Sequence, residues 1–173
     1  MQGIIKVILN LFSRKFLIKI SLILKPFFEL IFKGDRFVDP INNKSYSYFF
    51  PYGYNKLRKN ALSPGTLSLE RHRLLWIFLE KETDFFNTEN KILHIAPEQC
   101  FYKSFKKNFE SYTTCDLNSP IAEIKADVCN LPFDENEFDF VLCNHVLEHV
   151  YDDEKAMKEI YRVLKHEGKA ILQ

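Results

Sequence analysis

The sequence lacks any closely spaced pair of cysteines. Its four cysteines stand 14 or 15 residues apart and form no Cys-x-x-Cys motif: Cys100, Cys115, Cys129 and Cys143. This spacing excludes a disulfide framework and favours a reducing, intracellular setting. It also follows the spacing of the expected strand ends, so the thiols could converge on a metal ion. Small buried hydrophobic side chains are the favoured interpretation, and no metal site is predicted.

The amino-terminal segment, residues 1–36, lacks an uncharged run long enough to span a membrane. Its longest such run is Val7–Ser13, whereas a spanning helix needs ~20 apolar residues. A signal peptide fits poorly, because Lys and Arg interrupt the apolar residues and no small-residue cleavage site follows. Apolar residues instead recur at steps of three and four: Ile5, Leu9, Phe12, Phe16, Ile20, Ile23, Phe27 and Leu30. The pattern predicts a long amphipathic helix that Pro26 should kink or split.

Acidic residues are scarce in the same segment. Residues 1–36 contain seven basic and two acidic side chains, a net charge of +5, and the rest of the chain has a net charge of −4. A basic amphipathic segment on an acidic body favours a helix in a membrane interface, here residues 1–33. Packing of this helix on the protein or on a partner is the alternative. Nucleic-acid binding is disfavoured, since the charge outside this segment is negative.

The middle of the chain is rich in turn-forming residues. Residues 37–67 contain Asn42-Asn43 and several Pro and Gly residues, and one short strand is expected at Tyr46–Phe50. Ser68 is expected to cap a helix that runs to about Thr83. The charges of Ser68–Arg73 favour a solvated helix face over a contact with a ligand.

From Lys91 onward, short apolar runs alternate with helical patterns. The expected strands are Ile92–Ala96, Tyr112–Asp116, Ile124–Val128, Phe138–Cys143 and Lys169–Gln173. The expected helices are Tyr102–Phe109 and one that Asp152, Asp153 and Glu154 open and Gly168 ends. The alternation predicts an α/β fold with a Rossmann-like, doubly wound parallel sheet of about five strands.

Polar side chains follow the expected strands where a nucleotide-like ligand would lie. Asp116 ends the second strand, where a carboxylate can hold ribose hydroxyls, and Asp127 ends the third, where one can accept from an adenine amino group. Asn144 and His145 follow the fourth strand and face the same crevice. A nicotinamide dehydrogenase is disfavoured, because no G-x-G-x-x-G motif is present.

Several motifs in order resemble the class I S-adenosylmethionine-dependent methyltransferases: Asp127, Leu131-Pro132-Phe133, Phe138-Asp139, Asn144-His145-Val146-Leu147-Glu148-His149-Val150 and Glu159–Lys165. The resemblance implies S-adenosyl-L-methionine as the cofactor. It assigns Asp116 to the ribose, Asp127 to the adenine and the Asn144 backbone to the methionine part. Val128 and His145 are further expected cofactor-binding residues.

The first-strand loop departs from the glycine-rich loop of that family. It reads His94-Ile95-Ala96-Pro97-Glu98 and contains no glycine, which resembles a bacterial subgroup with a Leu-His-Ile-Ala-Pro-Glu start. The resemblance implies that His94, Ala96, Pro97 and Glu98 bind the cofactor, with Glu98 accepting from its amino group. Only seven residues separate Asp116 from Ile124, so a loop should replace the usual helix.

The same subgroup often carries paired zinc-ribbon cysteines before a Ser-Leu-Glu-Arg-His-Arg helix. The matching positions here are Asp39, Asn42, Ser63 and Thr66, which lack the thiolates that hold zinc. We therefore expect a basic helical segment at 1–36, a small irregular ribbon-like lobe without metal at 37–67, and a cofactor-binding core at 68–173.

The predicted function is methyl transfer to a small-molecule or glycan or lipid-precursor acceptor, in the cytoplasm or on the inner face of a membrane. His145 and His149 are the candidate catalytic bases with Glu148 beside them, and support of the helix start and the cofactor is the alternative role. The sequence stops at Gln173, within the fifth expected strand, which predicts a truncated core. An inactive cofactor-binding pseudoenzyme or a membrane-associated binding module is therefore the alternative function.

Overall fold

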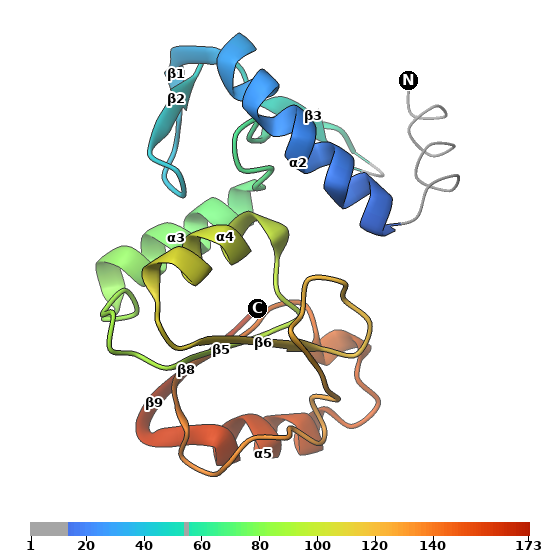
Figure 1. The fold of residues 1–173 in the computed structure, drawn as a ribbon, viewed down its shortest axis with the longest axis vertical. Coiled ribbons are helices and arrows are strands. Elements are labelled where there is room, and N and C mark those ends of the chain that lie inside the picture. The colour runs from blue at the N-terminus through green and yellow to red at the C-terminus, as the bar shows by residue number, and fades with distance from the viewer. Residues whose placement is uncertain (1–13, 54–55) are drawn as a thin grey trace. The chain divides into compact units, whose positions relative to one another are not determined.

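A computed structural model of the chain describes residues 14–53 and 56–173. The chain divides into two compact units, Met1–Trp76 and Ile77–Gln173 (Figure 1). Within the described residues, no helix is both long enough and apolar enough to cross a membrane.

The first unit contains one long helix and two antiparallel hairpins. Its elements are α2 (Arg14–Ile31), β1 (Lys33–Asp39), β2 (Lys44–Tyr46), β3 (Phe50–Tyr52) and β4 (Arg58–Leu62), with β1 paired to β2 and β3 to β4. Helix α3 (Glu70–Glu82) begins in this unit. The prediction of a single strand at Tyr46–Phe50 is wrong. Tyr46 and Phe49 are both buried, and this spacing of three residues cannot occur on one face of a continuous strand.

Helix α2 passes through Pro26 without interruption, so the expected split of this helix is wrong. The first part of the expected apolar stripe, Ile5 to Phe12, lies outside the described residues. Ser68 does not cap α3, because its hydroxyl is bonded to Thr66 and Asp39. The side chain of His72 instead accepts a hydrogen bond from the Leu69 amide through Nδ1 at 3.1 Å.

The second unit is built on a parallel sheet with the strand order β7-β6-β5-β8-β9. The strands are β5 (Ile92–Ile95), β6 (Tyr112–Asp116), β7 (Ile124–Lys125), β8 (Phe138–Cys143) and β9 (Leu164–Leu172). Helix α4 (Gln99–Asn108) covers one face, α5 (Asp153–Val163) covers the other, and a short 3₁₀ turn (Leu147–His149) follows β8 (Figure 1). This architecture confirms the expected α/β parallel sheet.

Alternate residues of the central strands face opposite helices, as strand geometry requires. His94 and Phe140 contact the aromatic cluster of Phe101, Phe105 and Phe85 on the α4 face. Leu93, Ile95, Val141 and Cys143 pack with Ala156, Ile160 and Val163 of α5 on the other face. Both faces are therefore buried, which explains the nearly continuous apolar sequence of β8.

Strands β6 and β8 have the predicted bounds, but other boundaries were wrong, among them the end of β5 at Ile95 rather than Ala96 and the start of β9 at Leu164 rather than Lys169. The third strand ends at Lys125 rather than at Val128, and α4 begins at Gln99 rather than at Tyr102. The last helix ends at Val163, and Gly168 lies inside β9. A register shift separates the pair Phe138–Leu164 from Phe140–Lys169. Gly168 fits this bulge, because a Cβ there would lie 3.0 Å from the Phe138 carbonyl oxygen.

Two predictions about connections are confirmed. Residues 117–123 join β6 to β7 as a loop without a helix. Asp152 caps α5 and accepts a hydrogen bond from the Lys155 amide at 2.9 Å, with Asp153 and Glu154 in the first turn. The segment from Asn144 to Val150, expected as a helix start, instead forms a bend and the 3₁₀ turn before that cap.

Candidate functional site

A pocket of about 490 Å³ lies at the carboxyl ends of the parallel strands. This is the edge at which open α/β sheets bind ligands. Its walls are formed by the ends of β5 and β6, the loop after β7, and the segment between β8 and α5. The lining residues are Ile95, Ala96, Asp116, Leu117, Ala126, Asp127, Val128, Cys129, His145, Val146, His149, Val150, Tyr151, Asp152 and Lys155.

Asp116 holds the loop that follows β6 as well as lining the pocket. Its Oδ1 accepts hydrogen bonds from the backbone amides of Asn118, at 2.7 Å, and Ser119. Within the described residues these bonds use only one carboxylate oxygen. The second oxygen can therefore accept from hydroxyl groups of a ligand, such as the vicinal pair of a ribose.

Asp127 lines the same pocket from the start of the loop after β7, the strand next to β6. Its Oδ1 accepts from the Cys129 amide at 2.9 Å, and its carbonyl oxygen accepts from the Asn130 amide at 2.9 Å. Val128 is buried, and it lines the same pocket as the half-exposed Leu117. A carboxylate between apolar walls suits a flat heteroaromatic ring that carries an amino group.

Ala96 has a left-handed backbone, with φ of 52°, where the chain leaves β5 for the pocket. This conformation costs a residue with a Cβ roughly 1–2 kcal/mol relative to right-handed backbone, and it is usually adopted by glycine. The Ala96 amide donates to the Cys115 carbonyl at 2.9 Å, which ties the turn to β6. The loop thus reaches a glycine-like geometry without a glycine.

A buried chain of hydrogen bonds supports this loop from beneath. His94 is completely buried, with Nδ1 2.8 Å from the Tyr112 hydroxyl and Nε2 2.6 Å from Glu98 Oε2. The Asn144 amide donates to Glu98 Oε1 at 3.0 Å. Burial raises the pKa of Tyr112, so its hydroxyl stays protonated and donates to Nδ1. With the Tyr112 hydroxyl as donor to Nδ1, the ring proton of His94 lies on Nε2 and is donated to the Glu98 carboxylate.

The predicted cofactor residues therefore divide into two sets. Ala96, Asp116, Asp127, Val128 and His145 border the pocket. His94, Pro97, Glu98 and Asn144 lie outside its lining, and three of them form the hydrogen-bonded support of the loop. Asn144 Oδ1 is buried and has no hydrogen-bond partner within the described residues.

Both candidate bases border the pocket. His145 has a left-handed backbone, with φ of 53°, and its Nδ1 lies 3.4 Å from Glu148 Oε1. The His145 amide donates to the Gln173 carbonyl at 2.8 Å, which fixes the loop against the end of β9. His149 lines the same wall from the 3₁₀ turn. Sequence reasoning missed Cys129, Tyr151 and Lys155, since they reach the pocket only through the fold of their loops.

The four cysteines differ in their surroundings. Cys115 and Cys143 are buried, and burial raises the pKa of each thiol to about 12, so both remain protonated. Cys129 donates to the Asp152 carbonyl at 3.4 Å. In the part of the chain that the structure describes, no group of three His, Cys, Asp or Glu residues could hold a metal ion.

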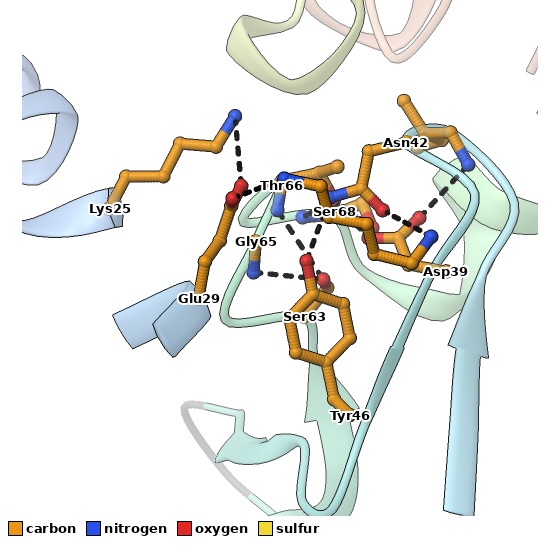
Figure 2. Close-up of polar contacts among 11 residues, drawn as sticks. Lys25, Glu29, Asp39, Asn42, Tyr46, Ser63, Gly65, Thr66 and Ser68 are labelled. Carbon is orange, nitrogen blue, oxygen red and sulfur yellow. Dashed lines mark hydrogen bonds and ion pairs between the residues drawn. The ribbon is translucent and has the colours of Figure 1, made fainter. Parts of the chain in front are cut away.

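The four positions matched to zinc-ribbon cysteines lie in two facing turns of the first unit (Figure 2). Thr66 Oγ1 donates to the fully buried Asp39 carboxylate at 2.5 Å, and Ser63 Oγ accepts from the Thr66 amide at 3.3 Å. The Asn42 amide donates to the Tyr46 hydroxyl at 2.8 Å. The Thr66–Asp39 hydrogen bond links the two turns, whereas the other two lie within one turn each. An interpretation of 37–67 as a metal-free ribbon stays a prediction.

Comparisons with known proteins agree with this geometry. Residues 89–172 match the family model described as "Methyltransferase domain". A 2-phytyl-1,4-naphtoquinone methyltransferase of Nostoc punctiforme is 44% identical over 52 residues, 30% of this chain and 23% of its own length. The ubiquinone/menaquinone biosynthesis C-methyltransferase of Rickettsia prowazekii is 34% identical over 92 residues, 53% of this chain and 36% of its own length.

Two further proteins have no named substrate. An uncharacterized protein of Methanocaldococcus jannaschii is 52% identical over 50 residues, 29% of this chain and 22% of its own length. The solved structure of the YcgJ protein from Bacillus subtilis is similar with a TM-score of 0.49 and 22% identity, over 60% of this chain and 50% of that one. The chain thus spans about a fifth to a third of the length of the curated relatives it matches.

The fold and the pocket define the second unit as an open α/β domain with its site at the strand ends. Residues 89–172 within it match a methyltransferase domain.

Proposed function

We propose that this protein binds S-adenosyl-L-methionine and transfers its methyl group to a small lipophilic acceptor. One observation carries the proposal: Asp116, at the end of β6, and Asp127, after the neighbouring β7, line one pocket together with the strained turn at Ala96. Two carboxylates with apolar residues between them match the hydroxyls and the amino-substituted ring of an adenosine.

The residues around the pocket have distinct roles in this proposal. Asp116 Oδ2 accepts from the ribose hydroxyls, and Asp127 accepts from the adenine amino group while Leu117 and Val128 cover the ring. Glu98, held by His94 and Asn144, accepts from the amino group of the methionine part. When bound, the cofactor would supply a methyl group made electrophilic by its positive sulfur.

The chain's own contribution to the reaction is positioning and proton removal. Residues at the strand ends hold the two reactants in line, which can supply much of the rate enhancement. His145 and His149 border the pocket and can accept the proton that the acceptor loses. The Glu148 carboxylate, 3.4 Å from His145 Nδ1, lies where it can accept a hydrogen bond from that ring.

The acceptor class is supported by the names of the relatives. Both named relatives are, by their names, methyltransferases of quinones or of quinone biosynthesis. A ring that carries a long hydrocarbon chain, such as the phytyl chain in one of these names, dissolves in a membrane. We therefore propose a quinone-like acceptor of this kind, with the protein working at the membrane surface on its cytoplasmic side.

Calorimetry with two ligands tests the cofactor site. S-adenosylhomocysteine contains the adenosine and amino-acid parts, whereas methylthioadenosine contains only the adenosine part. Asp116→Asn keeps an acceptor for the loop amides but loses the charge, so the affinity for both ligands should fall about tenfold or more. Glu98→Gln should weaken only S-adenosylhomocysteine, by about tenfold.

The control is Glu135→Gln, which changes an exposed carboxylate away from the pocket and should alter neither affinity. Absence of binding of either ligand to the folded wild-type chain would refute the proposal. Binding without transfer of a labelled methyl group to a demethylated quinone would favour the binding-module alternative.

A further inference from the structure

Helix α2 packs on its own unit through the side that carries Phe28. Phe28 and the following Phe32 lie against Phe50 of β3, with ring centroids 5.6 and 4.9 Å apart in edge-to-face geometry. These contacts fix the helix on the β3–β4 hairpin of its own unit and define which side of the helix is occupied.

The opposite side of α2 carries an exposed apolar stripe, defined as Phe16, Ile20, Ile23, Phe27 and Leu30. The residues follow each other at steps of four and three, so they share one face of the helix. Ile23, Phe27 and Leu30 are 73%, 59% and 75% exposed. Leu24 and Ile31 widen the stripe and are also exposed. A stripe of this size is the kind of surface that binds a partner or a lipid phase.

Basic side chains border the stripe. Lys19 is exposed one turn before Ile23, and Lys33 and Arg36 are exposed just after the helix. The single acidic residue of α2, Glu29, is paired with Lys44 at 2.6 Å and with Lys25 at 3.8 Å (Figure 2). Its charge is therefore neutralised within the protein. The exposed Asp35 offsets one of the charges of Lys33 and Arg36, and the surface around the stripe keeps a net positive charge.

A groove of about 590 Å³ opens beside the carboxyl end of the stripe. Leu30 lines it together with Lys33, the polar residues Ser45 and Tyr46, and the ion pair of Glu29 with Lys44. An apolar edge next to lysines suits a molecule with a hydrocarbon part and an anionic headgroup.

We propose that α2 lies in the plane of an anionic membrane, with the apolar stripe among the lipid chains and the surrounding lysines at the headgroups. The charge of the border selects an anionic lipid surface over a second copy of this chain, whose own cationic border would repel it. The purpose of this surface would be to bring the protein to an acceptor dissolved in the membrane, and in that respect the inference rests on the proposed function. Its test does not involve the cofactor.

Vesicle flotation of the full chain tests the surface. The probes are vesicles of phosphatidylcholine alone and of phosphatidylcholine with about 30% phosphatidylglycerol. Wild-type protein should float with the anionic vesicles. The triple change Ile23→Ser, Phe27→Ser, Leu30→Ser should lower the partition coefficient by about tenfold or more. Lys19→Glu with Lys33→Glu should weaken binding to the anionic vesicles and leave binding to the neutral ones unchanged.

Leu74→Ser is the matched control, because Leu74 is an equally exposed apolar residue on α3. It should float like the wild type, and circular dichroism should show the same helix content for all variants. Flotation that survives the triple change would overturn the inference. So would a wild-type dimer in lipid-free solution that the triple change converts to a monomer. Binding of S-adenosylhomocysteine without vesicles is measured separately, so failure of the cofactor site and failure of the membrane surface are distinguishable.

Discussion

At the scale of single residues, the loop between β5 and α4 combines strain with a buried support. Ala96 occupies a left-handed conformation, and the chain Tyr112–His94–Glu98–Asn144 holds the next residues in place. Strained backbone persists where the surrounding structure determines it and is common at ligand sites. The hydrogen bonds to Glu98 therefore explain how this loop tolerates alanine at a position that favours glycine.

Ala96→Gly tests the strain directly. Glycine removes the steric cost at positive φ but adds conformational freedom to the unfolded chain, so the two effects should nearly cancel. We expect the free energy of unfolding to change by no more than about 0.5 kcal/mol in urea denaturation.

The control is Ala156→Gly, at a buried position within α5. This change should lower the free energy of unfolding by at least about 1 kcal/mol. An equally large loss for Ala96→Gly would mean that the left-handed conformation carries no strain.

At the scale of elements, an ion pair within α5 binds the loop before β8 through hydrogen bonds to the loop backbone. Glu159 Oε2 accepts from the Leu131 amide and from Arg162, each at 2.8 Å. Arg162 also donates to the carbonyls of Phe133 and Leu131 at 2.8 and 2.9 Å. The Leu-Pro-Phe loop, which leads from the Asp127 wall to β8, is thereby held against the helix.

Glu159→Gln should weaken this link in a pH-dependent way. Hydrogen bonds from Arg162, and secondarily from the Leu131 amide, hold the pKa of Glu159 below its usual 4.5. A carboxyl group whose pKa is lower in the folded than in the unfolded state stabilises the fold at pH values above its unfolded-state pKa. This stabilisation is lost as the pH falls through the pKa of the folded state. The variant should lose about 1–2 kcal/mol at pH 7, and the difference from wild type should shrink below about pH 4.

Thermal or urea unfolding at several pH values measures the effect. Glu154→Gln changes an exposed ion pair on the same helix and should cost no more than about 0.5 kcal/mol. A loss for Glu159→Gln that is the same at pH 7 and pH 3 would show that charge is not its cause.

The accuracy of the sequence predictions differs between elements for physical reasons. β8 could be bounded to the residue, because a strand buried on both faces reads as a nearly continuous apolar run. The bounds of β6 followed from Tyr and Thr residues, which favour strands, and from the polar Asp116 at its end. β9 could not, since its first half is bulged and contains Lys165, His166 and Glu167. Tyr46–Phe50 read as one strand because aromatic residues favour strands, although tertiary packing buries Tyr46 and Phe49 together.

The candidate site was predictable only in part. Asp116 and Asp127 could be found because strand ends in a parallel sheet meet at one edge. The role of Tyr112 could not, because its link to His94 depends on side-chain packing between neighbouring strands. Lys155 reaches the pocket from the first turn of α5, and no local pattern indicates that.

At the scale of the whole molecule, the core of the second unit hides two thiols that report on its integrity. Cys115 and Cys143 are buried with pKa values raised to about 12, chiefly by burial, whereas Cys100 and Cys129 are partly exposed. Below pH 9, the ordinary thiol pKa, both folded and unfolded forms keep the proton. As the pH rises from 9 towards 12 the unfolded chain releases it first, so the fold should lose stability across that range.

Maleimide labelling at pH 8 followed by peptide mass mapping checks the burial. Cys100 and Cys129 should react within the native protein, and Cys115 and Cys143 should react only in urea concentrations that unfold the second unit. The variant Cys100→Ser with Cys129→Ser isolates the buried pair and should be nearly unreactive without urea. Rapid native labelling of this variant would show that the sheet opens far more readily than its packing implies.

The strand order of the sheet also determines which strand pairings must wait while the chain is being synthesised. The central strand β5 lies between β6 and β8 in the sheet. β8 is synthesised only after β6 and β7. Until the ribosome has released residues up to about 144, one edge of β5 is open, and Glu98 has not met Asn144. Such non-local pairing delays folding and leaves a strand edge exposed to other chains in the meantime. The nascent chain is therefore most exposed to misassociation in the interval between synthesis of β6 and synthesis of β8.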